Sequence, residues 1–380
     1  MEHPLYVYPE IHKYTNEEED DFLEKLADVA RHTRLDHVTL AKQLQIDEQG
    51  RTADGYRLTS TAFKQVCSVA GKGLDRLVTD LCGVFRSPED PRSDYSVAEA
   101  VRIYNLTLAL RFANRFVGNI QVIRNTRDSR IEGLVGRKYN YLANRAVYDM
   151  AHEAVSGAYR PVRFYEANLW GRRLSMRFIH QDPLFDIPAT APGVDRERFH
   201  GGYGFSNSEV GGEASVRASM LICRERDGAT AVGTGFSGRV VHTGSPKRFL
   251  QKLNKMFASV MAADQDADEL KRRMLGLRNV PLKLGGPEAE HEHQVDYLSL
   301  FLHRFDIPKA LARRIVLATI QSGSEPLMTY RTPDRRTMAA RTAFDLYSVI
   351  AREARGFAMP IRETAEQAAY SLLMGKVKLH

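Results

Sequence analysis

Arginine is the residue type that gives this chain its clearest chemistry. Residues 102–177 hold 14 Lys and Arg side chains against 5 Asp and Glu, which is a net charge of +9. The whole 380-residue chain carries +7, so the remainder is slightly acidic at −2. One guanidinium group can bind two phosphate oxygens at once. A localised positive charge favours a polyanionic partner. The concentrated charge therefore predicts that this stretch contacts nucleic acid.

The basic candidates fall into two groups, each on an expected β-hairpin. The first group is Arg124, Arg127, Arg130, Arg137 and Lys138, and the second is Arg160, Arg163, Arg172, Arg173 and Arg177. Tyr139, Tyr165 and Trp170 lie among them and could stack on unpaired bases. Strand alternation places Arg163, Tyr165 and Arg177 on the face opposite Phe164. Two interpretations stay open: a surface for single-stranded nucleic acid, or a solvated strand face whose arginines pair with acidic helical regions.

A glycine-rich segment at residues 200–212 is the second candidate, with five glycines in thirteen positions. It could be a structural turn, a backbone contact to phosphate or to another subunit, or an acid/base or metal site using Glu209 near His200. The candidate contact residues are Ser206, Asn207, Ser208, Glu209 and Gly211. A two-metal hydrolytic site needs several convergent carboxylates, and only Glu209 and Glu213 stand out here. We therefore assign no catalytic residue.

No cofactor or metal site is expected. His291 and His293 lie in a segment rich in Gly, Pro and Glu without a third ligand, which favours an exposed loop. The chain has no P-loop and no Gly-x-Ser-x-Gly elbow. Three widely spaced cysteines exclude a full disulfide framework and a cysteine-rich zinc site. No stretch approaches the roughly 18 apolar residues of a membrane-spanning helix, and residues 1–9 show no secretory signal. The cytoplasm is the expected compartment.

The pattern of elements predicts an α+β fold, with a central, mostly antiparallel sheet, helices packed on one of its faces, and helical N- and C-terminal regions. Helical periodicity begins near Asn16 and recurs at 59–70, 74–85 and 97–116. Alternation indicates hairpins around 120–135, around Gly171 and around Asp227-Gly228, with a helix at 141–155. The expected divisions are 1–117, 118–280, a linker at 281–293, and 294–380, whose helices include 295–305, 309–320, 340–354 and 361–374.

A helix is also expected to begin at Ser245-Pro246, because serine is a favoured cap and proline a favoured first helical residue. Its apolar residues recur every three or four positions and include Phe249, Leu253 and Phe257. One face of this helix must therefore be dry. The shortest arrangement lays that face across the sheet and leaves the arginine face open.

Several blocks in this order resemble the phage- and plasmid-like family catalogued as domain of unknown function 932. The blocks are residues 123–139, 164–179, 206–211, 342–347 and 362–366. The resemblance covers roughly 118–374 and leaves the first hundred or so residues unmatched. Where the family often has Cys-Asn-Gly, Cys223 is followed here by Arg224-Glu-Arg226, which puts any role of that element in doubt. The resemblance implies a mobile-element origin but no established activity.

These observations favour a DNA-binding protein of a phage or plasmid that acts on single strands in recombination, replication or repair without catalysis of its own. One alternative is a metal-dependent nucleic-acid-processing enzyme that uses Glu209. Another is an assembly protein in which the glycine-rich segment and the C-terminal helices contact other subunits, so a homo-oligomer is possible. No membrane partner is expected.

Overall fold

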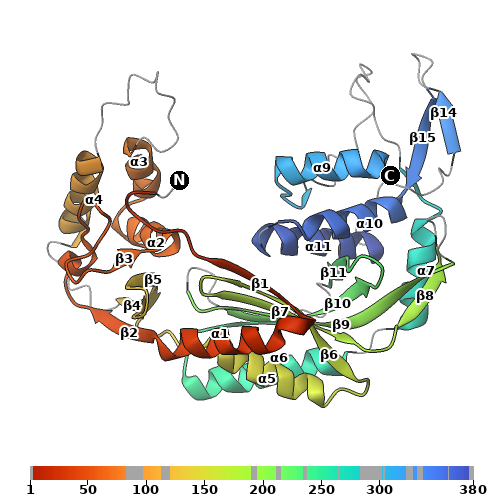
Figure 1. The fold of residues 1–380 in the computed structure, drawn as a ribbon, viewed down its shortest axis with the longest axis horizontal. Helices are drawn as coiled ribbons and strands as arrows, with labels where there is room; N and C mark the ends of the chain where they lie inside the picture. The colour runs from red at the N-terminus through yellow and green to blue at the C-terminus, as the bar shows by residue number, and fades with distance from the viewer. Residues whose placement is uncertain are drawn as a thin grey trace.

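The computed structural model describes residues 3–82, 97–112, 120–189, 195–210, 215–233, 238–263, 266–282, 302, 304–321, 328–331, 337–357 and 359–375. Over these ranges the protein has the α+β fold that the sequence predicted, with a large, mostly antiparallel sheet and flanking helices. Figure 1 shows a curved sheet across the middle with helices beneath it. A group of elements rises from each end of the sheet, and we call these groups the N-terminal arm and the C-terminal arm. Among the described residues, no helix is both long and apolar enough to span a bilayer.

The large sheet forms the floor between the arms. Its strand order is β1–β6–β7–β9–β10–β11, with β8 paired to β9 and β12 paired to β10. The strands are β1 (Ile11–Thr15), β6 (Val162–Trp170), β7 (Arg173–His180), β8 (Phe185–Pro188), β9 (Arg196–Ser208), β10 (Ser215–Arg224), β11 (Thr230–Val232) and β12 (Gly238–Val241). Leu174, Met176 and Phe178 of β7 are buried toward the helices beneath. We call this the outer face and the opposite one the inner face.

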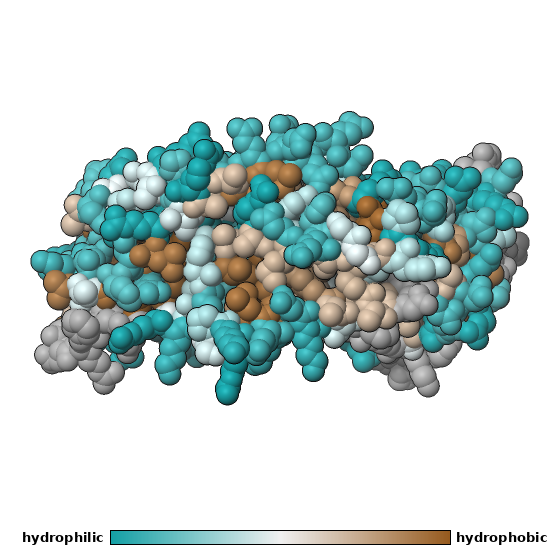
Figure 2. Space-filling model, turned by 90° about the horizontal axis from the view of Figure 1, so that it is seen from below, coloured by the Kyte–Doolittle hydropathy of each residue, from teal (hydrophilic) through white to brown (hydrophobic). Residues whose placement is uncertain are grey.

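Three helices cover the outer face: α1 (Glu19–Arg31), α5 (Asn144–Ser156) and α6 (Pro246–Ala262). The Ser245 hydroxyl accepts a hydrogen bond from the Arg248 amide at 3.4 Å, and Pro246 begins α6 as expected. Phe249, Leu253 and Phe257 are buried in the same core as the outer face of β7, which confirms the predicted packing. Seen from below, this side has hydrophilic margins and hydrophobic patches along its middle (Figure 2).

The N-terminal arm combines a four-stranded sheet with helices. Its elements are β2 (Thr33–Val38), β3 (Arg57–Leu58), β4 (Ile120–Asn125), β5 (Arg130–Gly136), α2 (Ser60–Ala70), α3 (Leu74–Leu81), α4 (Val97–Phe112) and the 3-10 turn at Ala41–Leu44. The strand order is β2–β4–β5–β3. A separate apolar core, which includes Phe63 and Tyr104, holds the helices against this sheet. The arm is therefore a folded unit with its own hydrophobic interior.

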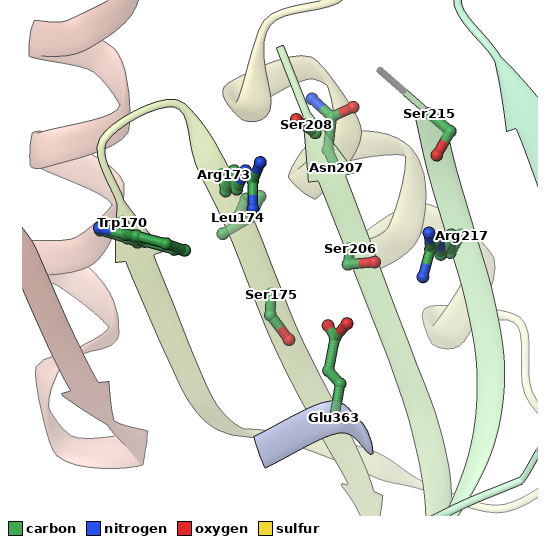
Figure 3. Close-up of a pocket in the computed structure, with 10 residues that line it drawn as sticks. All are labelled: Trp170, Arg173, Leu174, Ser175, Ser206, Asn207, Ser208, Ser215, Arg217 and Glu363. Carbon is green, nitrogen blue, oxygen red and sulfur yellow. The ribbon is translucent and has the colours of Figure 1, made fainter. Parts of the chain in front are cut away.

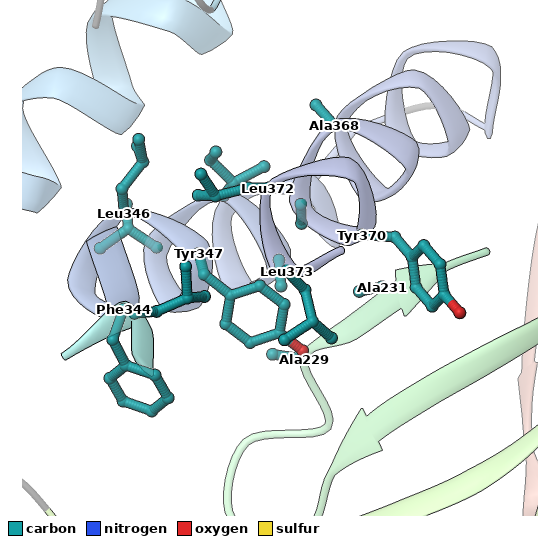
Figure 4. Close-up of a cluster of buried hydrophobic side chains, with 14 of the residues drawn as sticks. Ala229, Ala231, Phe344, Leu346, Tyr347, Ala368, Tyr370, Leu372 and Leu373 are labelled. Carbon is teal, nitrogen blue, oxygen red and sulfur yellow. The ribbon is translucent and has the colours of Figure 1, made fainter. Parts of the chain in front are cut away.

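The C-terminal arm is mostly helical. Its elements are α7 (Ala267–Leu277), α9 (Lys309–Ile320), α10 (Ala343–Ala354), α11 (Met359–Leu373), β13 (Pro281–Leu282), β14 (Met328–Arg331) and β15 (Thr337–Thr342). Figure 4 shows where the arm joins the large sheet: Tyr347 and Tyr370 lie near Ala229 and Ala231 at β11. The small alanine side chains let the helices approach the sheet closely.

The structure differs from the expected division at residue 117. Strands β1, β2 and β3 belong to the region that the sequence indicated as helical, and β2 pairs with β4 across that boundary. The sequences of β1 and β2 are short and polar and lack a clean apolar alternation. Periodicity therefore could not reveal these strands.

The glycine-rich segment also differs from the favoured expectation of a turn. Residues 200–208 lie inside β9, at the centre of the large sheet. A Cβ atom on Gly202 would lie 2.2 Å from the Phe178 carbonyl oxygen of β7, so glycine is required for this close approach. Residues 340–342, expected as helix, belong to β15. Most of the 281–293 linker, with His291 and His293, lies outside the described residues.

Candidate nucleic-acid interface

The inner face of the large sheet is polar where the outer face is apolar. On β7, Arg173 and Ser175 alternate with Leu174, and on β10, Arg217 and Ser219 alternate with buried apolar residues. This alternation follows from the strand period of two. The pattern therefore places arginine and serine side chains between the two arms, on the face that α1, α5 and α6 do not cover.

Two adjoining hollows on this face form one groove, the larger of them about 250 Å³. Figure 3 shows the residues that line the smaller hollow. We call the whole groove the serine–arginine groove. Its polar lining is Trp170, Arg173, Ser175, Arg177, Ser206, Asn207, Ser208, Ser215, Arg217, Ser219 and Arg239 from the sheet, with Glu363 and Gln367 from α11. The two hollows share Ser175, Ser206, Arg217 and Glu363. The groove therefore lies along the sheet and has α11 of the C-terminal arm as a wall.

A pair of arginines lies side by side in the groove. Arg217 of β10 and Arg239 of β12 are direct partners in the strand register, and both line the larger hollow. Like charges placed directly opposite in a sheet are destabilising. Arg239 is exposed, and its Nε donates to the Ser215 hydroxyl at 3.3 Å.

Trp170 and Arg173 form the end of the groove at the tip of the β6–β7 hairpin. The Arg173 guanidinium lies over the Trp170 ring, 5.2 Å from its centroid, and both side chains are half-buried. Gly171 makes the turn between them at a φ of +54°. The hairpin thus presents an aromatic ring and a cation together, as the sequence predicted for these two residues.

Two other arginines of this hairpin are buried. Arg177 lies on the face opposite Phe164, as strand alternation placed it, but its side chain is enclosed by the fold. Arg177 is 3% exposed and donates to Glu366 of α11 at 2.5 Å and to Glu166 at 2.8 Å. Arg172 is also 3% exposed and donates to Thr33 at 2.6 Å and to Glu209 at 3.3 Å. Both side chains are engaged inside the protein. This matches the alternative in which arginines pair with acidic groups elsewhere in the fold.

The arginines of the first hairpin are also largely paired. Arg124 is buried, pairs with Asp36 at 3.0 Å and with Asp54, and lies over the Tyr56 ring. Arg127 pairs with Asp28, and Arg130 pairs with Glu10 at 3.1 Å. Arg137, Lys138, Arg160 and Arg163 are exposed, and no ion pair is seen for them within the described residues. Much of the charge excess is thus neutralised inside the fold.

The two predicted tyrosines are held within the fold. The Tyr139 hydroxyl donates to the Glu209 carbonyl at 2.6 Å, its ring stacks on His242 at 5.2 Å, and burial raises its pKa. Tyr165 packs against a small cluster of buried apolar residues that includes Leu221. Trp170 is the one predicted aromatic residue that lines the groove.

The environment of Glu209 does not resemble a hydrolytic centre. Glu209 is 1% exposed and accepts hydrogen bonds from the Asn144 amide at 2.5 Å and the Tyr141 hydroxyl at 3.2 Å, besides Arg172. Burial raises its pKa, although Arg172 acts in the opposite direction. In the part of the chain that is described, no three His, Cys, Asp or Glu side chains are placed to hold a metal. Glu213, the other carboxylate of this segment, lies outside the described residues.

The remaining residues of the glycine-rich segment divide by face. Ser206 and Ser208 line the groove. Asn207 also borders the smaller hollow, but its side-chain amide is buried and donates to the Asn144 side-chain oxygen at 2.9 Å. Gly211 lies outside the described residues. Ser206 therefore offers a hydroxyl group to a ligand, whereas the Ser208 hydroxyl already donates to the Val210 carbonyl at 2.6 Å. The sequence had suggested a backbone or subunit contact for this segment.

Sequence reasoning missed the residues that complete the groove: Ser175, Arg217, Ser219, Arg239 and Glu363. Arg217 and Arg239 lie outside the basic stretch at 102–177, so the charge count passed over them. A signal was present, because the hairpin turn at Asp227-Gly228 indicated that these two strand segments could face each other. The contribution of Glu363 depends on how the C-terminal arm packs, which no local pattern indicates.

The chain matches no family model, no curated protein and no solved structure. The resemblance to the phage- and plasmid-like family therefore rests on the order of its residue blocks alone.

Proposed function

We propose that the protein binds single-stranded nucleic acid, with DNA as the favoured form, in the serine–arginine groove between its arms. The observation that carries the proposal is the cross-strand pair of Arg217 and Arg239 on an inner face lined with serines. A guanidinium group binds two phosphate oxygens at once, and hydroxyl groups are common donors to phosphate. The groove thus offers what a phosphodiester backbone requires.

The position of Trp170 favours a single strand over a duplex as the ligand. It lies at one end of the groove next to Arg173, where an unpaired base could stack on its ring. Such stacking is worth about 1–3 kcal/mol per base and does not depend strongly on sequence. In a duplex the bases are already stacked on one another. The proposed mode of binding is therefore backbone recognition with little sequence preference.

The cellular setting is part of the same proposal. The resemblance to phage- and plasmid-like proteins suggests a role in recombination, replication or repair of a mobile element. We place the protein in the cytoplasm, because its three cysteines are free and two of them, Cys67 and Cys223, are buried. Free thiols persist in a reducing compartment. Binding without cleavage is the form of activity that we propose.

The test is a titration of labelled single-stranded and duplex oligonucleotides at several salt concentrations. We expect tighter binding of the single strand, and for the variant Arg217→Gln/Arg239→Gln a slope of log affinity against log salt that is smaller by about 1.4, or about 0.7 per lost phosphate contact. Arg76→Gln/Arg102→Gln removes the same charge from exposed positions on the N-terminal arm and serves as control. An unchanged slope in a folded groove variant would overturn the proposal, and cleavage products with added Mg²⁺ would favour the enzyme alternative.

A further inference from the structure

Helix α6 carries a basic stripe on its exposed side. Arg248, Lys252, Lys255 and Ser259 follow one another at intervals of four, three and four residues and are all exposed. This spacing places them in one row along the helix. Since the apolar side of α6 is buried against the sheet, the row faces away from the core. We call it the α6 stripe.

The stripe is electrostatically unfavourable for the fold itself. Helix α6 contains no acidic residue, and the structure shows no ion pair for Arg248, Lys252 or Lys255 among the described residues. Like charges three or four positions apart destabilise a helix by roughly 0.2–0.5 kcal/mol per pair. Arg248 also lies in the first turn, where the helix dipole disfavours a cation. Folding alone gives no reason for this arrangement.

The α6 stripe is continuous with the serine–arginine groove. A separate hollow lies between α6 and β12, and its lining includes Arg239, Lys252, Lys255 and Ser259. Arg239 therefore belongs to both hollows. β12 pairs only with β10 in the described part of the chain, so it forms an edge of the large sheet. Positive charge thus runs from the inner face, around this edge, to the outer face.

The packing at the edge is tight enough to fix this path. A Cβ atom on Gly238 would lie 2.1 Å from the Met256 side chain, so α6 lies directly against the start of β12. The helix and the edge strand are therefore packed closely together, and Arg239 lies beside Lys252 and Lys255. A row of cations on neighbouring elements suits a ligand with regularly repeated negative charges.

We propose that the strand bound in the groove leaves it across β12 at Arg239 and continues along the α6 stripe on the outer face. This inference rests on the proposed function and extends it. The phosphodiester backbone would contact Lys252 and Lys255 after Arg239, and the strand would bend around the sheet edge. The binding site is then longer than the groove, and only strands that reach past β12 contact the lysines.

The test compares a short and a long labelled single strand, about 6 and about 30 nucleotides. The first is near the lower end of the roughly 4–16 nucleotides that single-strand binding domains cover, and the second exceeds that range. Lys252→Gln/Lys255→Gln should leave affinity for the short strand unchanged. It should lower affinity for the long strand about tenfold and reduce the salt slope by about 1.4, or 0.7 per contact. The control Lys42→Gln/Lys64→Gln removes two exposed lysines from the N-terminal arm and should change neither.

The outcomes separate this inference from the proposed function. Two results would overturn the proposed path along α6 while leaving binding in the groove intact. One is equal affinity of wild type and variant for the long strand, and the other is an equal loss of affinity for both strand lengths. Failure of the wild type to bind either strand would overturn both. Vesicles of phosphatidylserine and phosphatidylcholine provide a further test. Vesicle binding that depends on Lys252 and Lys255 would assign the α6 stripe to a lipid surface instead.

Discussion

At the scale of single residues, burial divides the arginines of one hairpin into two roles. Arg172 and Arg177 are buried beside carboxylates, whereas Arg173 lies half-buried over Trp170 at the groove. Removing one partner of a buried ion pair costs about 3–5 kcal/mol, because the other charge is left without compensation. Substitutions of Arg172 and Arg177 would therefore report on stability. Among these three, only Arg173 can report on ligand binding alone.

Glu363 gives a prediction at the same scale. Its carboxylate points from α11 into the groove, near Ser175 and Ser206 (Figure 3). A negative charge there repels a phosphate, with a cost on the order of 1 kcal/mol for charges about 4 Å apart in water. Glu363→Gln should therefore raise affinity for a single strand roughly fivefold, measured by fluorescence anisotropy at low salt.

Gln367 provides the reciprocal control for this prediction. It lies one turn after Glu363 on α11 and lines the same groove. Gln367→Glu adds a negative charge and should weaken binding by a similar factor. A gain in affinity with both substitutions, or with neither, would contradict an electrostatic role for this wall of the groove.

At the scale of elements, much of the fold follows from local patterns. The β6–β7 hairpin, the turn at Gly228 and the capped start of α6 lie where alternation, glycine and Ser245-Pro246 placed them. Each of these signals lies within a few neighbouring residues. Local consistency of this kind is typical of segments whose structure depends little on distant contacts.

The elements that sequence reasoning missed depend on distant contacts. β1 is a short polar strand whose position follows from pairing with β6, and β9 contains glycines because β7 approaches it closely. The groove required α11 to meet β10 and β12, and α11 begins more than a hundred residues after them. The pairing of Arg177 with Glu366 spans 189 positions. No period or motif within one segment carries that information.

Helix α6 allows a direct test at this scale. Leu253 is fully buried in the core shared by α6 and the sheet. Leu253→Asp would bury an unpaired charge and should destabilise the protein by roughly 4 kcal/mol or more, measured by thermal denaturation. Leu250→Asp lies on the exposed side of the same helix and should change stability by no more than about 0.5 kcal/mol. A wild-type melting curve for Leu253→Asp, with a smaller oligomer, would show that the apolar side of α6 is a subunit interface.

At the scale of the whole molecule, the two buried arginines of the β6–β7 hairpin each connect one arm to the sheet. Arg172 donates to Thr33 at the start of β2, and Arg177 donates to Glu366 on α11. Helix α11 contributes to both the anchorage and the groove. Glu366 joins the buried ion pairs, and Glu363, three positions earlier, lines the groove. The contact that anchors the C-terminal arm therefore also positions a wall of the binding site.

Glu166 makes this anchorage dependent on pH. It pairs with Arg177 at 2.8 Å and with Arg362 of α11. Burial raises the pKa of Glu166, but the two arginines outweigh it and lower the pKa from 4.5 to about 2. Because the folded-state pKa lies below the unfolded value, the ionised carboxylate stabilises the protein above about pH 4.5. This stabilisation is lost as the pH falls through about 2.

Glu166→Gln should therefore cost the most stability near neutral pH and progressively less in acid. The lowered pKa corresponds to a difference on the order of 3 kcal/mol, which urea unfolding at about pH 7 would detect and which should shrink markedly by about pH 3. Comparison with wild type at each pH cancels the contributions of Glu132 and Glu209, whose pKa values burial raises and which therefore act in the opposite direction. Glu48→Gln, at an exposed position without an ion pair among the described residues, is the control. A stability difference that stays constant from neutral pH to acid would show that Glu166 anchors the arm by packing and hydrogen bonding, without its charge.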